Sequence, residues 1–213
     1  MNRKKAILFA LLLLAFCAGF FTHSYLVRRV HDVRSNAENF SIIGMGGALD
    51  SARFKCYLSL AMNVSPNDLH ATVVGGHGDT TMIPLTRLAT WNGTPVADYL
   101  DAETLKKVAA DTMIGGATLT GLLGTSAWYA PGAASMAVVE SIIRDEKRVI
   151  PCSVYLEGEY GQSDICMGVP VVLGRTGWEK IIDYKLNEEE QAAFAKSAIA
   201  VRNMNEVLST LTL

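Results

Sequence analysis

The chain has 213 residues, of which 50% are hydrophobic and 19% charged, and its formal net charge is −2. Residues 1–34 hold six basic residues and one acidic residue, a charge of +5, whereas the remainder holds 13 basic and 20 acidic residues, a charge of −7. An acidic body excludes the chain-wide basic surface of nucleic-acid binders, so no nucleic-acid partner is expected. The hydrophobic content excludes intrinsic disorder.

The N-terminal segment combines basic residues with a long apolar run. Arg3, Lys4 and Lys5 precede residues 6–27, which contain no Asp, Glu, Lys or Arg. This run is longer than the roughly 7–15 apolar residues of a signal peptide and reaches the roughly 20 that a spanning helix needs. Residues 1–27 are therefore predicted to be an apolar helix serving as a signal peptide or a membrane anchor, followed by a linker at 28–41. The protein would then be exported or membrane-associated.

The remaining chain mixes helices and strands. Helical spacing of apolar residues predicts four helices, from about Asp50 to 62, at 102–123, at 126–144 and from 187 to about 208. Short apolar runs predict five strands, at 69–74, 85–91, 149–156, 165–173 and 178–184. Asn92 and Gly93 predict a hairpin turn. Because helices and strands do not alternate strictly, we expect an α+β fold in which antiparallel strands pack against long helices.

Helix starts have recognisable caps at two places. Asp50 or Ser51 is expected to cap the first helix of the body. At the last helix, Asn187 with Glu190 three residues later is typical of a capping box. A short apolar stub at 41–44 precedes the first of these helices.

Two short runs carry residue types suited to acid–base chemistry. Asp50 and Arg53 are three residues apart, so one helix face can present both. The run GGHGD at 75–79 places His77 between glycines at a predicted strand end, where backbone can approach a ligand closely. A carboxylate beside an imidazole would make an acid–base pair, and a guanidinium suits a carboxylate ligand. Taken singly, each run fits better as an ordinary helix-start aspartate or a turn histidine.

Motifs for cofactors and metals are absent from the sequence. The two glycine-rich runs depart from the dinucleotide pattern G-x-G-x-x-G at Leu49 and Thr81. Cysteines and histidines are scattered without metal-ligand spacing, so no metal site is predicted.

Four runs together resemble one family: IGMGGALDSARF at 43–54, VGGHGDTTMIPL at 74–85, SAWYAPGAA at 126–134 and YLEGEYG at 155–161. From about residue 42 to the end, the sequence resembles the C-terminal catalytic half of the lactate/malate dehydrogenase family, in particular the bacterial malate dehydrogenases of lactate-dehydrogenase-like type. The resemblance implies a C-terminal dehydrogenase domain over 42–213. It also implies oxidoreductase activity that interconverts malate and oxaloacetate with NAD, a reaction of the tricarboxylic acid cycle.

The resemblance assigns roles to four residues. His77 matches the catalytic histidine that exchanges a proton with the substrate hydroxyl, and Asp50 matches the carboxylate that orients it. Arg53 matches the arginine that binds the substrate's C1 carboxylate. Ser126 falls in a helix that lines the substrate pocket. The resemblance also implies that the substrate is a small dicarboxylate or 2-hydroxy acid and that the assembly is a homo-oligomer. A cytoplasmic location, as for the family, is the alternative to export.

The sequence departs from the family ahead of Ile42. There the family has a Rossmann domain that binds NAD, whereas residues 1–41 here are the apolar segment and the linker. NAD is thus implied by the family, with no fingerprint for it in this chain. We therefore expect the chain alone not to oxidise malate, and to require a separate NAD-binding chain. The alternative is a non-catalytic, membrane-tethered relic or interaction module. A truncated or fused gene is the favoured origin.

Overall fold

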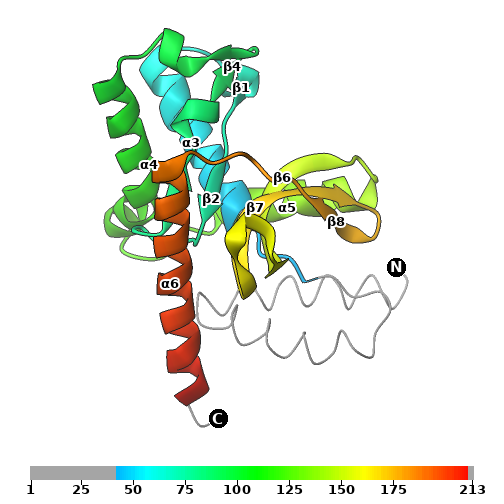
Figure 1. Ribbon diagram of the computed structural model, residues 1–213. Coiled ribbons are helices and arrows are strands. Elements are labelled where there is room, and N and C mark those ends of the chain that lie inside the picture. Colours follow the sequence, from blue (N-terminus) through cyan, green and yellow to red (C-terminus); the bar gives the residue numbers. More distant parts are fainter. Residues whose placement is uncertain (1–41, 211–213) are drawn as a thin grey trace.

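The computed structural model describes residues 42–210, which form antiparallel sheets packed with four long helices (Figure 1). The α+β class predicted from the sequence is confirmed. The segment predicted as signal or anchor, 1–27, and the linker at 28–41 lie outside the described residues. Between residues 42 and 210, no helix combines the length and apolar character needed to cross a membrane.

The larger sheet carries the strand that leads to His77. Its order is β3-β2-β7-β6, and β8 also pairs with β7. Its strands are β2 (Val73–Gly75), β3 (Met82–Pro84), β6 (Arg148–Glu157), β7 (Ser163–Gly174) and β8 (Gly177–Ile181). A smaller sheet consists of β1 (Leu69–His70), β4 (Thr90–Trp91) and β5 (Thr94–Pro95). Gly75, at the end of β2, pairs with Gly168 of β7, so the long β6–β7 hairpin supports the site strand.

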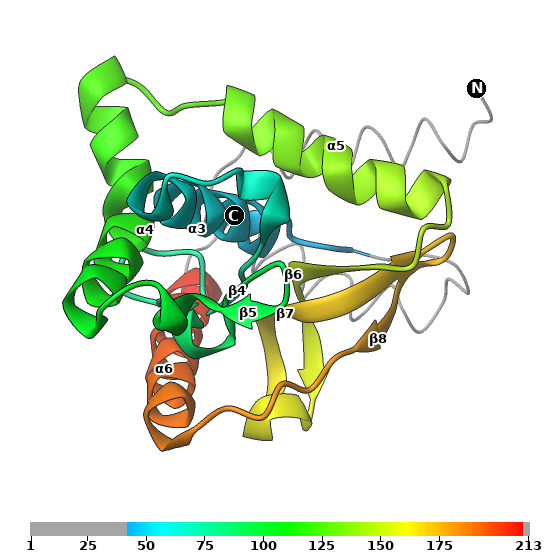
Figure 2. The same ribbon diagram turned by 90° about the horizontal axis from the view of Figure 1, so that it is seen from above.

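Helix α3 (Gly46–Met62) lies at the centre of the fold. Figure 2 shows it flanked by α4 (Ala102–Leu123) and α5 (Tyr129–Ile143), with the large sheet beyond. Phe54 and Leu58 of α3 are completely buried. The fourth helix, α6 (Glu188–Thr210), packs against β2, β3 and β7. Its C-terminal turns extend past the sheet (Figure 1).

The helix at 102–123 matches its predicted bounds because both ends carry local signals. The Asp101 side chain accepts a hydrogen bond from the Thr104 N–H at 2.8 Å, and Gly124 ends the helix at φ 68°. The hairpin turn at Asn92 and Gly93 is also confirmed, since both residues have positive φ between β4 and β5.

The predicted strands at 69–74, 85–91 and 178–184 were wrong in extent. The first divides into β1 and β2, which pair in different sheets. In the second, Thr86–Leu88 form a 3₁₀ helix that buries Leu85 and Ala89, a spacing that a short apolar run does not distinguish from a strand. The third ends at Ile181, because the backbone of Ile182 and Tyr184 hydrogen-bonds the Tyr160 hydroxyl.

Two predicted helix starts were also wrong. The first helix begins at Gly46, and neither Asp50 nor Ser51 caps it. Both residues lie within the helix and are buried against the rest of the protein. The Ser51 hydroxyl accepts a hydrogen bond from the Val73 N–H at 2.9 Å. The start is fixed by packing and by two hydrogen bonds between the backbones of Gly44 and Ser153. Helix α5 begins at Tyr129, three residues later than predicted.

The predicted capping box of α6 is confirmed. The Asn187 side chain accepts from the Glu190 N–H, and the Glu190 carboxylate accepts from the Asn187 N–H, both at 2.8 Å. The same carboxylate accepts two hydrogen bonds from Arg87. Burial raises the pKa of Glu190, but the hydrogen bonds from Arg87 and Asn187 outweigh it and hold the pKa below its usual value.

Replacing Glu190 by glutamine is expected to lower the free energy of unfolding by about 1 kcal/mol at neutral pH. Because the folded-state pKa of Glu190 is depressed, its stabilisation is present above the unfolded-state pKa and is lost as pH falls through the folded-state pKa. The difference in the free energy of unfolding between wild type and variant should therefore become smaller at acidic pH. Urea unfolding across this pH range measures it, with the neighbouring exposed Glu189→Gln as control. An equal loss in the control would contradict a role of the cap.

Candidate active site

Asp50 is the centre of a three-residue cluster. Its side chain is 2% exposed, and its two oxygens bind different partners. Oδ2 lies 2.6 Å from His77 Nδ1, and Oδ1 accepts from Arg53 Nη1 at 3.1 Å. Since a carboxylate only accepts hydrogen bonds, Nδ1 carries a proton. The structure thus brings together Asp50, Arg53 and His77, although His77 lies 27 residues away along the chain.

The imidazole of His77 is oriented and partly open to solvent. Its side chain is 44% exposed, and within residues 42–210 the contact with Asp50 is its one hydrogen bond. With Nδ1 bound to the carboxylate, Nε2 is the nitrogen that can exchange a proton with a ligand. This is the arrangement of an acid–base histidine fixed in one tautomer by a buried carboxylate.

The first turn of α3 lies directly beneath the imidazole. A Cβ atom on Gly46 would come within 2.7 Å of His77 Cγ and 2.9 Å of Nδ1. Because real side chains do not approach so closely, the ring can take its place only while residue 46 is glycine. Sequence reasoning missed this residue, because Gly46 stood in a glycine-rich run ahead of the predicted helix start at Asp50.

The loop that carries His77 begins at a backbone position suited to glycine. Gly75 ends β2 with φ +95°, a region that L side chains rarely adopt. The Thr81 hydroxyl accepts from the Gly78 N–H at 2.9 Å and donates to the Gly78 carbonyl at 3.1 Å, which closes the far side of the loop. The loop at 75–81 is therefore a defined turn.

Arg53 points its guanidinium toward α4. Its side chain is 18% exposed, and a Cβ on Gly115 of α4 would come within 2.7 Å of its Cδ. Within the described residues its hydrogen bonds, to Asp50 and to the Thr112 carbonyl at 3.4 Å, all come from Nη1. Nε and Nη2 of Arg53 therefore remain available, and their N–H groups can donate two parallel hydrogen bonds to the two oxygens of a carboxylate.

The structure does not bring Ser126 into this cluster. Ser126 is exposed and lies in the connection between α4 and α5, so its predicted position in a helix was wrong. The reason is local: Gly124 ends α4 in the left-handed conformation, and α5 starts only at Tyr129. None of its hydrogen bonds within the described part of the chain reaches Asp50, Arg53 or His77.

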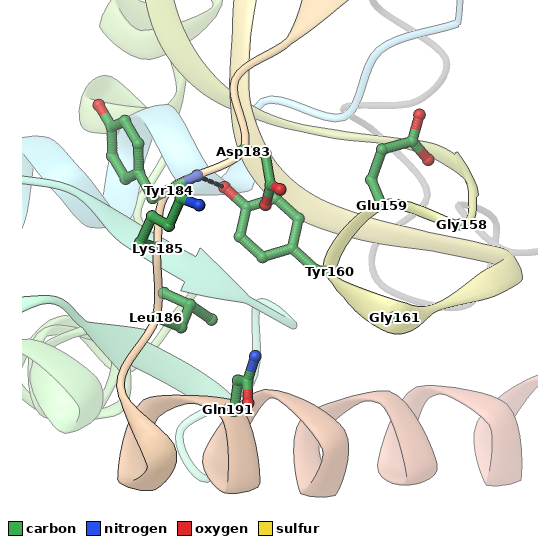
Figure 3. Close-up of a pocket in the computed structure, with 9 residues that line it drawn as sticks. All are labelled: Gly158, Glu159, Tyr160, Gly161, Asp183, Tyr184, Lys185, Leu186 and Gln191. Atoms are coloured by element: carbon green, nitrogen blue, oxygen red, sulfur yellow. Dashed lines mark hydrogen bonds between the residues drawn. The ribbon is translucent and has the colours of Figure 1, made fainter.

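A cavity of about 280 Å³ lies elsewhere, between the β6–β7 hairpin tip and the segment that enters α6 (Figure 3). The Tyr160 hydroxyl accepts from the Tyr184 N–H at 2.9 Å and donates to the Ile182 carbonyl at 2.7 Å. Burial raises the pKa of Tyr160 to about 12, and its ring stacks on Phe194 of α6 with centroids 5.1 Å apart. Tyr160 therefore serves to pin the hairpin to α6, and the cavity lining shares no residue with the His77 cluster.

The chain is similar to known dehydrogenases in both sequence and fold. Residues 47–209 match the family described as lactate/malate dehydrogenase, alpha/beta C-terminal domain. The malate dehydrogenase of Flavobacterium frigidimaris is 61% identical over 190 residues, 89% of this chain and 60% of that protein. That of Bacteroides thetaiotaomicron is 64% identical over 167 residues, 78% of this chain and 53% of that protein.

Two solved structures show the likeness in the fold. Malate dehydrogenase from Salinibacter ruber superposes with a TM-score of 0.80 at 39% identity, covering 85% of this chain and 59% of that one. Lactate dehydrogenase from Cryptosporidium parvum, in complex with lactic acid and nicotinamide adenine dinucleotide, superposes with a TM-score of 0.81 at 31% identity. The match covers 87% of this chain and 60% of that one. The chain belongs to the lactate/malate dehydrogenase family, and it is homologous to malate dehydrogenases over their C-terminal domain.

The matches cover only part of the relatives but most of this chain. The chain spans about 60% of the length of the F. frigidimaris relative. A match of 190 residues cannot fit between Ile42 and Leu213 of a 213-residue chain, so the similarity includes residues upstream of Ile42.

The two glycine-rich runs do not form a pyrophosphate-binding loop. Both glycine-rich runs are filled by the chain itself. A Cβ on Gly47 would come within 2.9 Å of the Pro151 carbonyl oxygen, and one on Gly76 within 2.7 Å of Thr81 Oγ1. With Gly46 against His77, neither run leaves the open backbone that cradles a pyrophosphate. Residues 42–210 also contain no group of three His, Cys, Asp or Glu side chains arranged to hold a metal ion.

Proposed function

We propose that this chain supplies the substrate-binding and acid–base residues of an NAD-dependent malate dehydrogenase. The observation that carries the proposal is the carboxylate of Asp50 bound at once to His77 and Arg53, in a chain of this family. The relatives' names support malate rather than lactate, since the curated relatives at about 60% identity are malate dehydrogenases.

The chain's own residues account for substrate binding and proton transfer. Nε and Nη2 of Arg53 would bind the C1 carboxylate of malate through two parallel hydrogen bonds. Nε2 of His77 would accept the proton of the malate hydroxyl on oxidation and return it to the carbonyl oxygen of oxaloacetate on reduction. Asp50 stabilises the imidazolium that exists between these steps.

A fusion enzyme tests the proposal. The part of the F. frigidimaris malate dehydrogenase that precedes its match to Ile42 is joined to residues 42–213 of this chain, and NADH formation from malate and NAD is followed by absorbance. We expect activity in the fusion and none in the 213-residue chain alone. Arg53→Lys, which keeps the charge but loses the planar pair of donors, should lower kcat/KM at least about tenfold.

Arg87→Lys is the control for that substitution, because Arg87 lies in the exposed ion pair with Glu190. It should leave kcat/KM of the fusion unchanged. A folded wild-type fusion without activity would contradict the proposal. A second candidate, a non-catalytic interaction module, would then be favoured by the exposed apolar side chains around the α4–α5 junction: Leu122, Leu123, Trp128, Tyr129 and Met136.

We further propose that residues 1–27 direct the protein to a membrane or across it, supported by the uncharged run at 6–27 behind three basic residues. Fractionation of cells that express the C-terminally tagged chain tests this. Full-length chain in the membrane fraction indicates an anchor, and a shortened exported chain indicates a signal peptide. Full-length chain found only in the soluble cytosol would contradict both and support the cytoplasmic alternative.

A further inference from the structure

We propose that Ser197 of α6 is a positioning residue for His77, because its hydroxyl holds both ends of the loop that carries the imidazole. The inference rests on the proposed function in that His77 is taken as the acid–base residue. Ser197 lies 120 positions beyond His77 in the chain, and no pattern around it in the sequence points to the site.

The hydroxyl of Ser197 makes two hydrogen bonds to the backbone, one before and one after His77 in the chain. It accepts from the Gly76 N–H at 2.8 Å and donates to the Thr81 carbonyl at 2.8 Å. Gly76 immediately precedes His77, and Thr81 ends the turn four residues later. Ser197 is only 3% exposed, so water does not readily replace these two bonds. One side chain therefore bridges the two ends of the loop, next to the Gly75–Met82 pair of β2 and β3.

Apart from Ser197, the loop is attached to the rest of the protein by the contact of His77 with Asp50 and by the strand pairing of Gly75. The hydrogen bonds between Thr81 and Gly78 lie inside the turn, where they hold its shape but not its place. Asp50 holds the imidazole from α3, and Ser197 holds the backbone from α6. In addition to the sheet that supports β2, two helices thus hold the 2.6 Å contact between His77 and Asp50.

The loop packs closely against α6, so the two residues that precede His77 have no room for a side chain. A Cβ on Gly75 would come within 3.0 Å of Ser197 Oγ, and one on Gly76 within 3.3 Å of Val201 Cγ2. A serine at position 197 adds two hydrogen bonds in a space that also admits alanine. Removal of the hydroxyl therefore changes the bonding of the loop without forcing the helix away.

Helix α6 has other attachments that would survive this removal. Glu190 near its start is bound by Arg87, and Phe194 stacks on Tyr160. Toward its end, Arg202 donates to the carbonyls of Ser163 and Asp164. The loss of the Ser197 hydroxyl is therefore expected to act on the His77 loop rather than on the docking of α6.

The test is NMR spectroscopy of the full 213-residue chain labelled with ¹⁵N in its histidines and backbone, without substrate or NAD. The His77 ring signals, including the proton on Nδ1, are assigned by their loss in His77→Asn. In Ser197→Ala we expect the Nδ1 proton signal to shift or broaden, and hydrogen exchange at the Gly76 amide to accelerate about tenfold. Ser197→Thr, which keeps the hydroxyl, should restore the ring signals toward wild type.

Ser141→Ala is the matched control, because Ser141 is fully buried and its hydroxyl donates to the Leu173 carbonyl, away from the loop. It should leave the His77 signals unchanged. Equal changes in the two alanine variants, or unchanged His77 signals in Ser197→Ala, would overturn the proposal. If the alanine variant does not fold, Ser197→Cys replaces it with the same expectation, since a thiol is a weak donor and acceptor.

The result is independent of the test of function. An inactive fusion together with altered His77 signals in Ser197→Ala would refute the dehydrogenase proposal and retain the positioning role. An active fusion together with unaltered His77 signals in Ser197→Ala would support the dehydrogenase proposal and refute the positioning role.

Discussion

Asp50→Asn is expected to lower kcat of the fusion enzyme by about 10²- to 10⁴-fold, the range that general acid–base catalysis contributes. The substitution preserves the shape of the side chain and removes its charge. The loss should therefore come from the protonation of His77 rather than from a change in packing.

The geometry of the cluster explains why an amide cannot substitute for the carboxylate. Asp50 accepts hydrogen bonds on both oxygens, from Arg53 Nη1 and from His77 Nδ1. An asparagine has one accepting oxygen, and because arginine can only donate, that oxygen must face Arg53. The amide NH₂ then faces Nδ1, which favours the neutral tautomer protonated on Nε2 and disfavours the imidazolium. In that form His77 cannot accept the proton of the malate hydroxyl at Nε2.

Two measurements check this prediction. Steady-state kinetics of the fusion give kcat, and ¹⁵N spectra of the histidine rings in the chain itself report which nitrogen carries the proton. Asp111→Asn is the control, since Asp111 forms an exposed ion pair with Lys107 on α4. A variant at Asp50 that keeps wild-type kcat, or keeps the proton on Nδ1, would show that the pair does not act as proposed.

Gly46→Ala is expected to lower kcat by up to about 10²-fold, the cost of displacing a catalytic group by about 1 Å. The added Cβ would lie 2.7 Å from His77 Cγ, so the ring must move away from Asp50. Because the imidazole is 44% exposed, it has room to do so. The conformational gain of replacing a helical glycine by alanine, about 0.5–1 kcal/mol, then offsets part of the cost of the collision. Activity should therefore fall far more than stability.

Gly121→Ala provides the matched control for this effect. Gly121 lies in α4, and a Cβ there would meet nothing within 4 Å. The control should be as stable as wild type or more so, with unchanged kcat. Thermal unfolding and kinetics of both variants make the comparison. If Gly46→Ala retained full activity, the close approach of the helix to His77 would have no role in positioning the ring.

Elements with local signals were predictable from the sequence. The helix at 102–123 has a capping aspartate and a terminal glycine, and the last helix has its capping box. The long strands at 149–156 and 165–173 are apolar over most of their length because both contribute to the core, and each is found with only a few more residues. In all four cases the side chains that define the element lie within it or next to it.

Elements whose ends depend on distant partners were not predictable. Helix α3 starts at two glycines, which are poor helix formers, because they pack against His77 and Pro151 and because Gly44 bonds to Ser153. The aspartate expected to cap this helix instead lies inside it, bound to His77. Tertiary contacts overrode local preference at the site itself.

The sequence by itself determined the residue types of the candidate site and one of its contacts. Asp50 and Arg53 share a helix face because of their spacing, and the family resemblance singled out His77. Only the tertiary structure decided that Asp50 Oδ2 meets His77 Nδ1 at 2.6 Å and that Ser197, 121 residues from Gly76, holds the loop. The reason is physical: helix geometry fixes neighbours three or four residues apart, whereas contacts between distant segments depend on how a whole core packs.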